Sequence, residues 1–154
     1  MWTMAQRERV VLEHRLLHQE GLTQFGVYYD RARDRYDVLG TALTNAGNAY
    51  ELWSPIPLGF PDSRPSLYVL RPNPLRDALG GTVNSVGLSH KMHTLESGPQ
   101  GMVQICHWRG DRWHAGITLS KVLIKGLLWL EAYEQHIATG QPIDSFVRTM
   151  TGAS

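Results

Sequence analysis

The sequence predicts an α+β fold in a single domain spanning residues 1–154, with helices before and after an antiparallel sheet. Three observations support this prediction. Apolar residues follow a helical spacing over 4–19, short β-branched and aromatic runs lie between 24 and 56, and an apolar helical stripe covers 118–138. Strands joined by short turns pair antiparallel, and helices grouped outside such strands define the α+β class. A chain of 154 residues can bury a core without disulfides or metals.

The N-terminal part predicts one helix and three strands. Residues 4–19 form the helix, and Gly21 is a plausible stop signal. The runs QFGVYYD, RYDVLGTALT and AYELWSPIP read as strands, and turn-forming residues at 30–34 and 45–48 separate them. We therefore expect an antiparallel meander. The predicted apolar face of the helix consists of Val10, Val11, Leu12, Leu16 and Leu17.

The middle of the chain is interrupted by prolines from Pro55 to Pro74. Proline cannot donate to a strand ladder, so only the run SLYVL between Pro65 and Pro72 can form a sound strand. This run is the fourth strand of a predicted four-stranded antiparallel meander. Residues 75–100 are weakly periodic and predict an extended loop, and GMVQIC predicts a short strand or an extended arm.

A long helix is expected next. Thr118 or Ser120 can cap its start, and the helix should reach about Ala138 before the Gly140-Gln141-Pro142 stop. The predicted apolar stripe consists of Leu119, Leu123, Leu127, Leu130 and Ile137. Beyond this helix we expect only a short tail.

Composition excludes several classes of function. The 15 basic and 14 acidic residues nearly cancel, which argues against a nucleic-acid binder that relies on broad phosphate neutralisation. No apolar run is long enough to span a bilayer, and the N-terminus lacks the pattern of a signal peptide. A single cysteine excludes an internal disulfide framework, so we expect a cytoplasmic protein.

The one cysteine, Cys106, ends an apolar run and precedes the polar turn His107-Trp108-Arg109-Gly110-Asp111. Three interpretations compete. It is a small buried hydrophobe, a metal ligand together with His90 and His93, or a nucleophile that carries an acyl group. The metal interpretation lacks a paired CxxC motif, and adjacent Cys106 and His107 cannot readily converge on one ion. A Cys-His hydrolase is a poor fit, because consecutive side chains on an extended arm point to opposite faces.

The order of these features resembles the ubiquitin-conjugating enzyme fold over about residues 5–138. The segment GFPDSRPSLYVLRP resembles the turn and fourth strand of that family, GMVQIC resembles its cysteine arm, and RWHAGITLSKVLIKGLLWL is similar to its W-x-P-x-x-(T/S)-(L/I)-x-x-V-L stretch. The family's His-Pro-Asn tripeptide is missing, and SHKMH stands in its neighbourhood. His114-Ala115 replaces the proline expected after the tryptophan. The short tail and the SHKMH loop resemble compact bacterial relatives encoded in anti-phage CBASS operons.

This resemblance implies an enzyme without a cofactor, in which Cys106 forms a thioester with the C-terminus of a partner and passes it to an amine. The family's oxyanion-stabilising Asn has no clear counterpart here, so the position of the upstream loop, and not the resemblance, suggests His93 and next His90 as the residues that polarise the thioester. Asp111, Trp113 and His107 would shape or gate the site. The implied partner is a cGAS-like cyclic-oligonucleotide synthase or a ubiquitin-like protein, with or without a separate activating enzyme. A catalytically silent binding module of the same fold remains the alternative from another class, beside a zinc protein using His90, His93 and Cys106.

Overall fold

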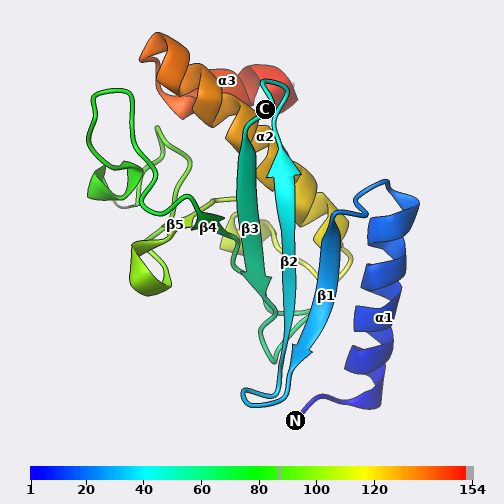
Figure 1. Cartoon of the computed structure of the whole chain (residues 1–154). Coiled ribbons are helices and arrows are strands. Elements are labelled where there is room, and N and C mark those ends of the chain that lie inside the picture. The colour runs from blue at the N-terminus through cyan, green and yellow to red at the C-terminus, as the bar shows by residue number, and fades with distance from the viewer. Residues whose placement is uncertain (87, 152–154) are drawn as a thin grey trace.

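The structure, a computed structural model, describes the backbone of residues 1–86 and 88–151 and the side chains of residues 1–84 and 88–147. It confirms the α+β class. Figure 1 shows an N-terminal helix beside one edge of an antiparallel sheet, with a long helix crossing behind the sheet. The elements in chain order are α1 (Met4–Gln19), β1 (Phe25–Asp30), β2 (Arg35–Leu43), β3 (Ala49–Pro55), β4 (Tyr68–Arg71), β5 (Val103–Gln104), α2 (Leu119–Thr139) and α3 (Ile143–Thr151).

The sheet is a meander with the strand order β1-β2-β3-β4-β5, and every neighbouring pair is antiparallel. Burial alternates along β3, where Tyr50, Leu52 and Ser54 are buried and the residues between them are not. This alternation is the two-residue period of a strand with one face on the core. The predicted four strands are one too few, because the cysteine arm adds β5 by pairing with β4 at Tyr68 and Val69.

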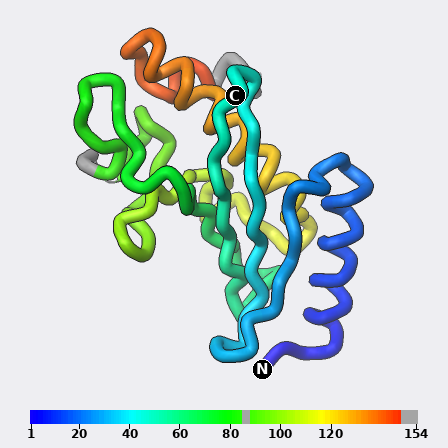
Figure 2. The backbone as a smooth tube through the Cα atoms, viewed as in Figure 1, coloured from blue at the N-terminus to red at the C-terminus, as the bar shows by residue number. Residues whose placement is uncertain are grey.

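Helix α2 covers the inner face of the sheet, as the tube in Figure 2 also shows. Thr118 caps its start by accepting the Lys121 amide at 3.3 Å, and Gly140 ends it with a φ of 77°. A Cβ added at Gly126 would lie 2.7 Å from the Leu67 side chain, so this glycine allows helix and sheet to approach closely. Among the described residues, no helix has the length and apolar character that crossing a membrane requires.

Helix α1 has the predicted bounds but a narrower buried face. Val10 and Leu17 are buried, whereas Val11 and Leu12 are 53% and 48% exposed. The expectation that Val11 and Leu12 belong to the core face was wrong, because Glu13 takes the place beside Val10 and Leu17. Glu13 is fully buried, and its carboxylate accepts from Arg9 Nε at 2.7 Å and from the Leu119 amide at 2.8 Å. This carboxylate joins α1 to the start of α2.

The expectation of only a short tail after α2 was wrong. Helix α3 follows, and its first residue, Ile143, is fully buried, while Phe146 and Val147 pack partly against the same core. The positions 143, 146 and 147 have the spacing of an amphipathic helix. The backbone amide of Asp144 donates to the Lys91 carbonyl at 2.7 Å, so α3 is docked on the loop upstream of the cysteine.

Candidate functional site

Cys106 follows β5 on an arm whose backbone is fixed from both sides. The Ile105 amide donates to the Leu67 carbonyl at 2.8 Å, and the Cys106 amide donates to the His93 carbonyl at 2.9 Å. Ile105 and His107 are buried, at 1% and 5% exposure, whereas the Cys106 free thiol between them is half-buried. The cysteine is therefore outside the buried core cluster, on an arm that is firmly held.

The loop upstream of the cysteine is a closed turn from Ser89 to Thr94, which pair with each other through two backbone hydrogen bonds of 3.0 Å. Met92 anchors this turn, because its side chain is buried and its carbonyl accepts from the indole of Trp129 at 2.9 Å. His93 has a φ of 51°, a left-handed conformation that histidine adopts more readily than most residues. The turn therefore holds the His93 carbonyl where it binds the Cys106 amide.

The His93 ring is paired with α3. Its Nε2 donates to Asp144 Oδ1 at 2.6 Å, and both side chains are about one-fifth exposed. His90 is exposed, with its ring centroid 5.5 Å from that of His93. The structure thus places His93 directly beside the cysteine arm through its backbone, and His90 one turn further out. Asp144 is a site residue that the sequence reasoning missed.

His107 lies inside the fold. Its Nε2 donates to the Pro65 carbonyl at 2.6 Å, so the arm is also tied to the proline-rich turn. Burial lowers the pKa of His107 to about 4, and the nearby charges of Arg64 and Lys125 act in the same direction, while the hydrogen bond to Pro65 opposes them. His107 is therefore neutral at pH 7. It supports the arm from within and does not line its exposed side, so the expected gating role has no geometric support.

Trp113 and Asp111, both expected near the site, have different environments. Trp113 is partly buried against the core, its indole donates to the Pro61 carbonyl at 2.9 Å, and its ring meets His107 edge-on at 6.2 Å. It forms part of the support under the arm. Asp111 is on the surface of a 3-10 turn, Gly110–Arg112, where its carboxylate pairs with Arg109 at 3.3 Å. Asp111 is thus exposed to solvent.

Two cations that the sequence reasoning did not assign to the site lie beside this arm. Lys125 of α2 places its Nζ 3.6 Å from the centroid of the Trp108 ring, and Arg64 donates to the Trp108 carbonyl. Burial lowers the pKa of Lys125, and attraction to the Cys106 thiolate acts in the opposite direction. The signal in the sequence was the position of Lys125 within the apolar segment 122–130, where a solvated lysine is not expected.

The described residues contain no group of three histidine, cysteine, aspartate or glutamate side chains arranged to hold a metal ion. The zinc interpretation of His90, His93 and Cys106 therefore finds no ligand cluster in the described part of the chain. The geometry leaves Cys106 as a free thiol beside a histidine carbonyl and a lysine.

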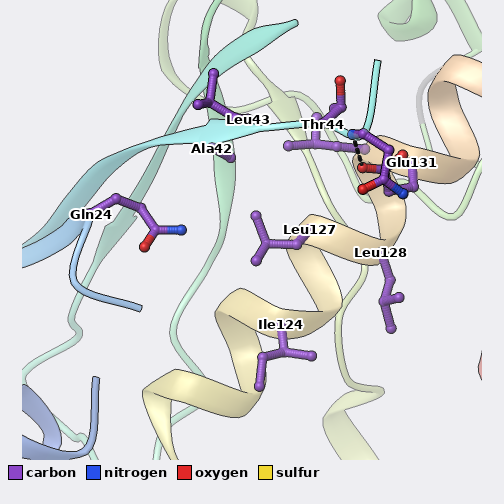
Figure 3. Close-up of a pocket in the computed structure, with 10 residues that line it drawn as sticks. Gln24, Ala42, Leu43, Thr44, Ile124, Leu127, Leu128 and Glu131 are labelled. Carbon is purple, nitrogen blue, oxygen red and sulfur yellow. Dashed lines mark hydrogen bonds between the residues drawn. The ribbon is translucent and has the colours of Figure 1, made fainter. Parts of the chain in front are cut away.

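A separate pocket of about 380 Å³ lies between α2 and the end of β2. Figure 3 shows Leu43, Ile124 and Leu127 around it, with Glu131 at one end. None of the residues assigned to the cysteine site lines this pocket. The pocket is thus distinct from the cysteine site.

Comparisons of the chain with protein-family models, with curated proteins and with solved structures found no match. The assignment of a function therefore depends on the residues and on their geometry.

Proposed function

We propose that this protein is a ubiquitin-conjugating-like acyl carrier, in which the Cys106 thiol forms a thioester with the C-terminus of a partner protein and transfers it to an amine. The observation that supports this proposal best is the environment of Cys106. The residue is partly exposed, while the amides of Ile105 and Cys106 are held by hydrogen bonds to the carbonyls of Leu67 and His93. A carrier needs such a fixed and reachable sulfur, because the bound acyl group must meet its acceptor in a defined position.

The surroundings of the sulfur suit transfer better than hydrolysis. The adjacent histidine, His107, has its ring buried and donates to Pro65, so it is not available as a base over the thiol. His93 is the candidate for polarising the thioester carbonyl, with its imidazole oriented by Asp144. A thioester without a positioned base reacts slowly with water, and an incoming amine is the stronger nucleophile. His90, being exposed, could contact the acyl donor.

The proposed partner is a cGAS-like cyclic-oligonucleotide synthase of an anti-phage system or, alternatively, a ubiquitin-like protein, each supplying a C-terminal carboxyl group. Direct reaction of a carboxylate with a thiol is unfavourable, so the acyl group must arrive in an activated form, with or without a separate activating enzyme. A free thiol works in a reducing compartment, and we therefore place this activity in the cytoplasm. The proposed chemistry uses no cofactor.

The test is capture of the thioester. The protein is incubated with the activated partner, and the adduct is followed on non-reducing gels and by mass spectrometry. We expect an adduct that a thiol reagent removes, that Cys106→Ala abolishes, and that Cys106→Lys converts into a thiol-stable amide. Replacement of His114, an exposed residue beyond the arm, by Ala is the matched control and should leave the adduct unchanged.

An adduct that persists in Cys106→Ala would overturn the carrier proposal. Complete absence of an adduct, together with partner binding that Cys106→Ala does not weaken, would favour the silent binding module. A chelator should affect neither folding nor transfer, since loss of either would indicate a metal protein.

A further inference from the structure

We propose that Lys125 is an internal acceptor, whose amine takes the acyl group from the Cys106 thioester and keeps it as a stable amide on α2. This inference rests on the proposed function, because the acyl group must first be bound to Cys106. Lys125 is then a site of self-modification, where the amide limits or marks the loading of Cys106 with acyl groups.

The geometry supporting this inference is the fixed position of the lysine beside the arm. Trp108 is two residues beyond Cys106, and the Lys125 Nζ is 3.6 Å from the centroid of the Trp108 ring. Such a distance is a close cation–π contact, which restrains a side chain that would otherwise be mobile. Trp108 is itself restrained, since its carbonyl accepts from Arg64. The amine is thus held next to the segment that carries the thiol.

Burial of Lys125 favours the uncharged amine that the transfer needs. Burial lowers the pKa of Lys125, and attraction to the Cys106 thiolate partly restores it. A thioester carries no charge on sulfur. In the loaded protein, burial therefore acts on Lys125 without that attraction, and burial favours the free, nucleophilic amine. Among the described residues, no carboxylate forms an ion pair with Lys125 to oppose this change.

The reaction is an S-to-N acyl transfer. The Lys125 ammonium first loses a proton to solvent, and the resulting amine attacks the thioester carbonyl. A C–N bond forms, the C–S bond breaks, and the Cys106 thiolate leaves with the bonding electron pair. The second proton on nitrogen is lost as the amide forms, and the thiolate can take up a proton again. The transfer needs no oxidant, metal or further reactant.

The other two lysines of the chain serve as internal controls. Lys121, one helical turn before Lys125 on α2, is exposed, and Lys91, in the turn between Ser89 and Thr94, is also exposed. Neither makes a contact with an aromatic ring of the arm among the described residues. Simple exposure would favour these two lysines as acceptors, whereas restraint beside the thioester favours Lys125.

The experiment loads the full chain with the mercaptoethanesulfonate thioester of a short peptide that ends in glycine. Exchange with the Cys106 thiol gives a peptide thioester on the protein. Samples taken over time are treated with hydroxylamine, which removes thioesters and leaves amides, and are mapped by peptide mass spectrometry. We expect amide at Lys125 to exceed that at Lys91 or Lys121 by at least tenfold. Lys125→Arg should leave the thioester intact, and Lys121→Arg should behave like wild type.

The outcomes separate this inference from the proposed function. A thioester that forms on Cys106 but gives no amide, or gives equal amide on all three lysines, would overturn the inference and leave the carrier proposal standing. Equal acylation of Lys125 in Cys106→Ala would also overturn it, since the amine would then react directly with the reagent. Failure of the thioester itself to form would overturn both. The comparison of the three lysines uses the wild-type protein alone, so a folding defect in a variant cannot imitate that result.

Discussion

At the scale of single residues, the site is defined by the contrast between Cys106 and His107. These neighbours on one extended arm lie in opposite environments, because successive side chains of such an arm point to opposite faces. The sulfur is half-buried and the imidazole is 5% exposed. Attachment of the imidazole to Pro65 inside the fold keeps Cys106 on the less buried face of the arm. His107 thus acts on the site as an anchor, and its state of protonation should affect the stability of the whole arm.

The low pKa of buried His107 predicts that the folded protein loses stability in acid. The pKa of His107 is about 4 in the folded protein and about 6.5 in an unfolded chain, so the unfolded state binds a proton first as the pH falls. The contribution of His107 to stability is complete above about pH 6.5 and declines between about pH 6.5 and pH 4. Over this interval it amounts to about 3 kcal/mol. Urea unfolding at a series of pH values measures it.

The matched variant is His107→Gln, which keeps a side-chain N–H donor but does not titrate in this range. We expect it to be less stable than wild type at pH 7 and to lose less stability between pH 6.5 and pH 4. An identical pH dependence in both proteins would show that other groups are responsible for the acid sensitivity.

At the scale of elements, α3 is more than a terminal addition, because it contacts the turn that supports Cys106. The Asp144 amide donates to the Lys91 carbonyl, and its carboxylate binds the His93 ring at 2.6 Å. The His93 carbonyl in turn binds the Cys106 amide. A change at the start of α3 should therefore reach the cysteine through two hydrogen bonds.

A double-mutant cycle tests this connection. The variants His93→Ala, Asp144→Ala and the pair of substitutions together are compared by urea unfolding. Because both side chains are about one-fifth exposed, we expect a coupling free energy of about 0.5 to 1 kcal/mol at pH 6, so the double variant should be less destabilised than the sum of the single ones. Asp144→Asn, which can still accept a hydrogen bond, should retain part of the coupling. Strictly additive effects would mean that the two residues act independently.

At the scale of the whole molecule, the sequence predicted local features better than contacts between distant segments. The bounds of α1, the three-strand meander and the capping of α2 by Thr118 follow from periodicity and turn residues, which act over a few positions. Helix α3 also had a signal in the spacing of its apolar residues, but the segment after the Gly140-Gln141-Pro142 stop was interpreted as a short tail. By contrast, the hydrogen bond from the Leu119 amide to Glu13 and the hydrogen bond between Asp144 and His93 join residues far apart in the chain.

In the candidate site, too, the sequence predicted local features better than contacts between distant segments. That Cys106 ends an apolar arm was visible in the sequence, and so was the unusual position of Lys125 within an apolar segment. That Lys125 faces the Trp108 ring depends on how α2 lies on the sheet, which a local pattern does not determine. Local patterns therefore identify the reacting residue, whereas packing identifies the groups that act on it.

Packing of the sheet against α2 also predicts how stability is distributed over the molecule. Strand β2 pairs with β1 on one side and β3 on the other, and its Val38 and Ala42 are buried. We therefore expect its amides to exchange with solvent only when the whole domain unfolds. The turn at 77–81 is different, because its amides bond mainly to Asp77, and Leu79 is 96% exposed.

Hydrogen exchange at increasing urea should show β2 amides whose opening free energy falls with the slope of global unfolding. The amides of Leu79 and Gly81 should exchange at least a hundredfold faster with almost no slope. Equal rates in β2 and in the turn would contradict a single cooperative unit made of the sheet and α2.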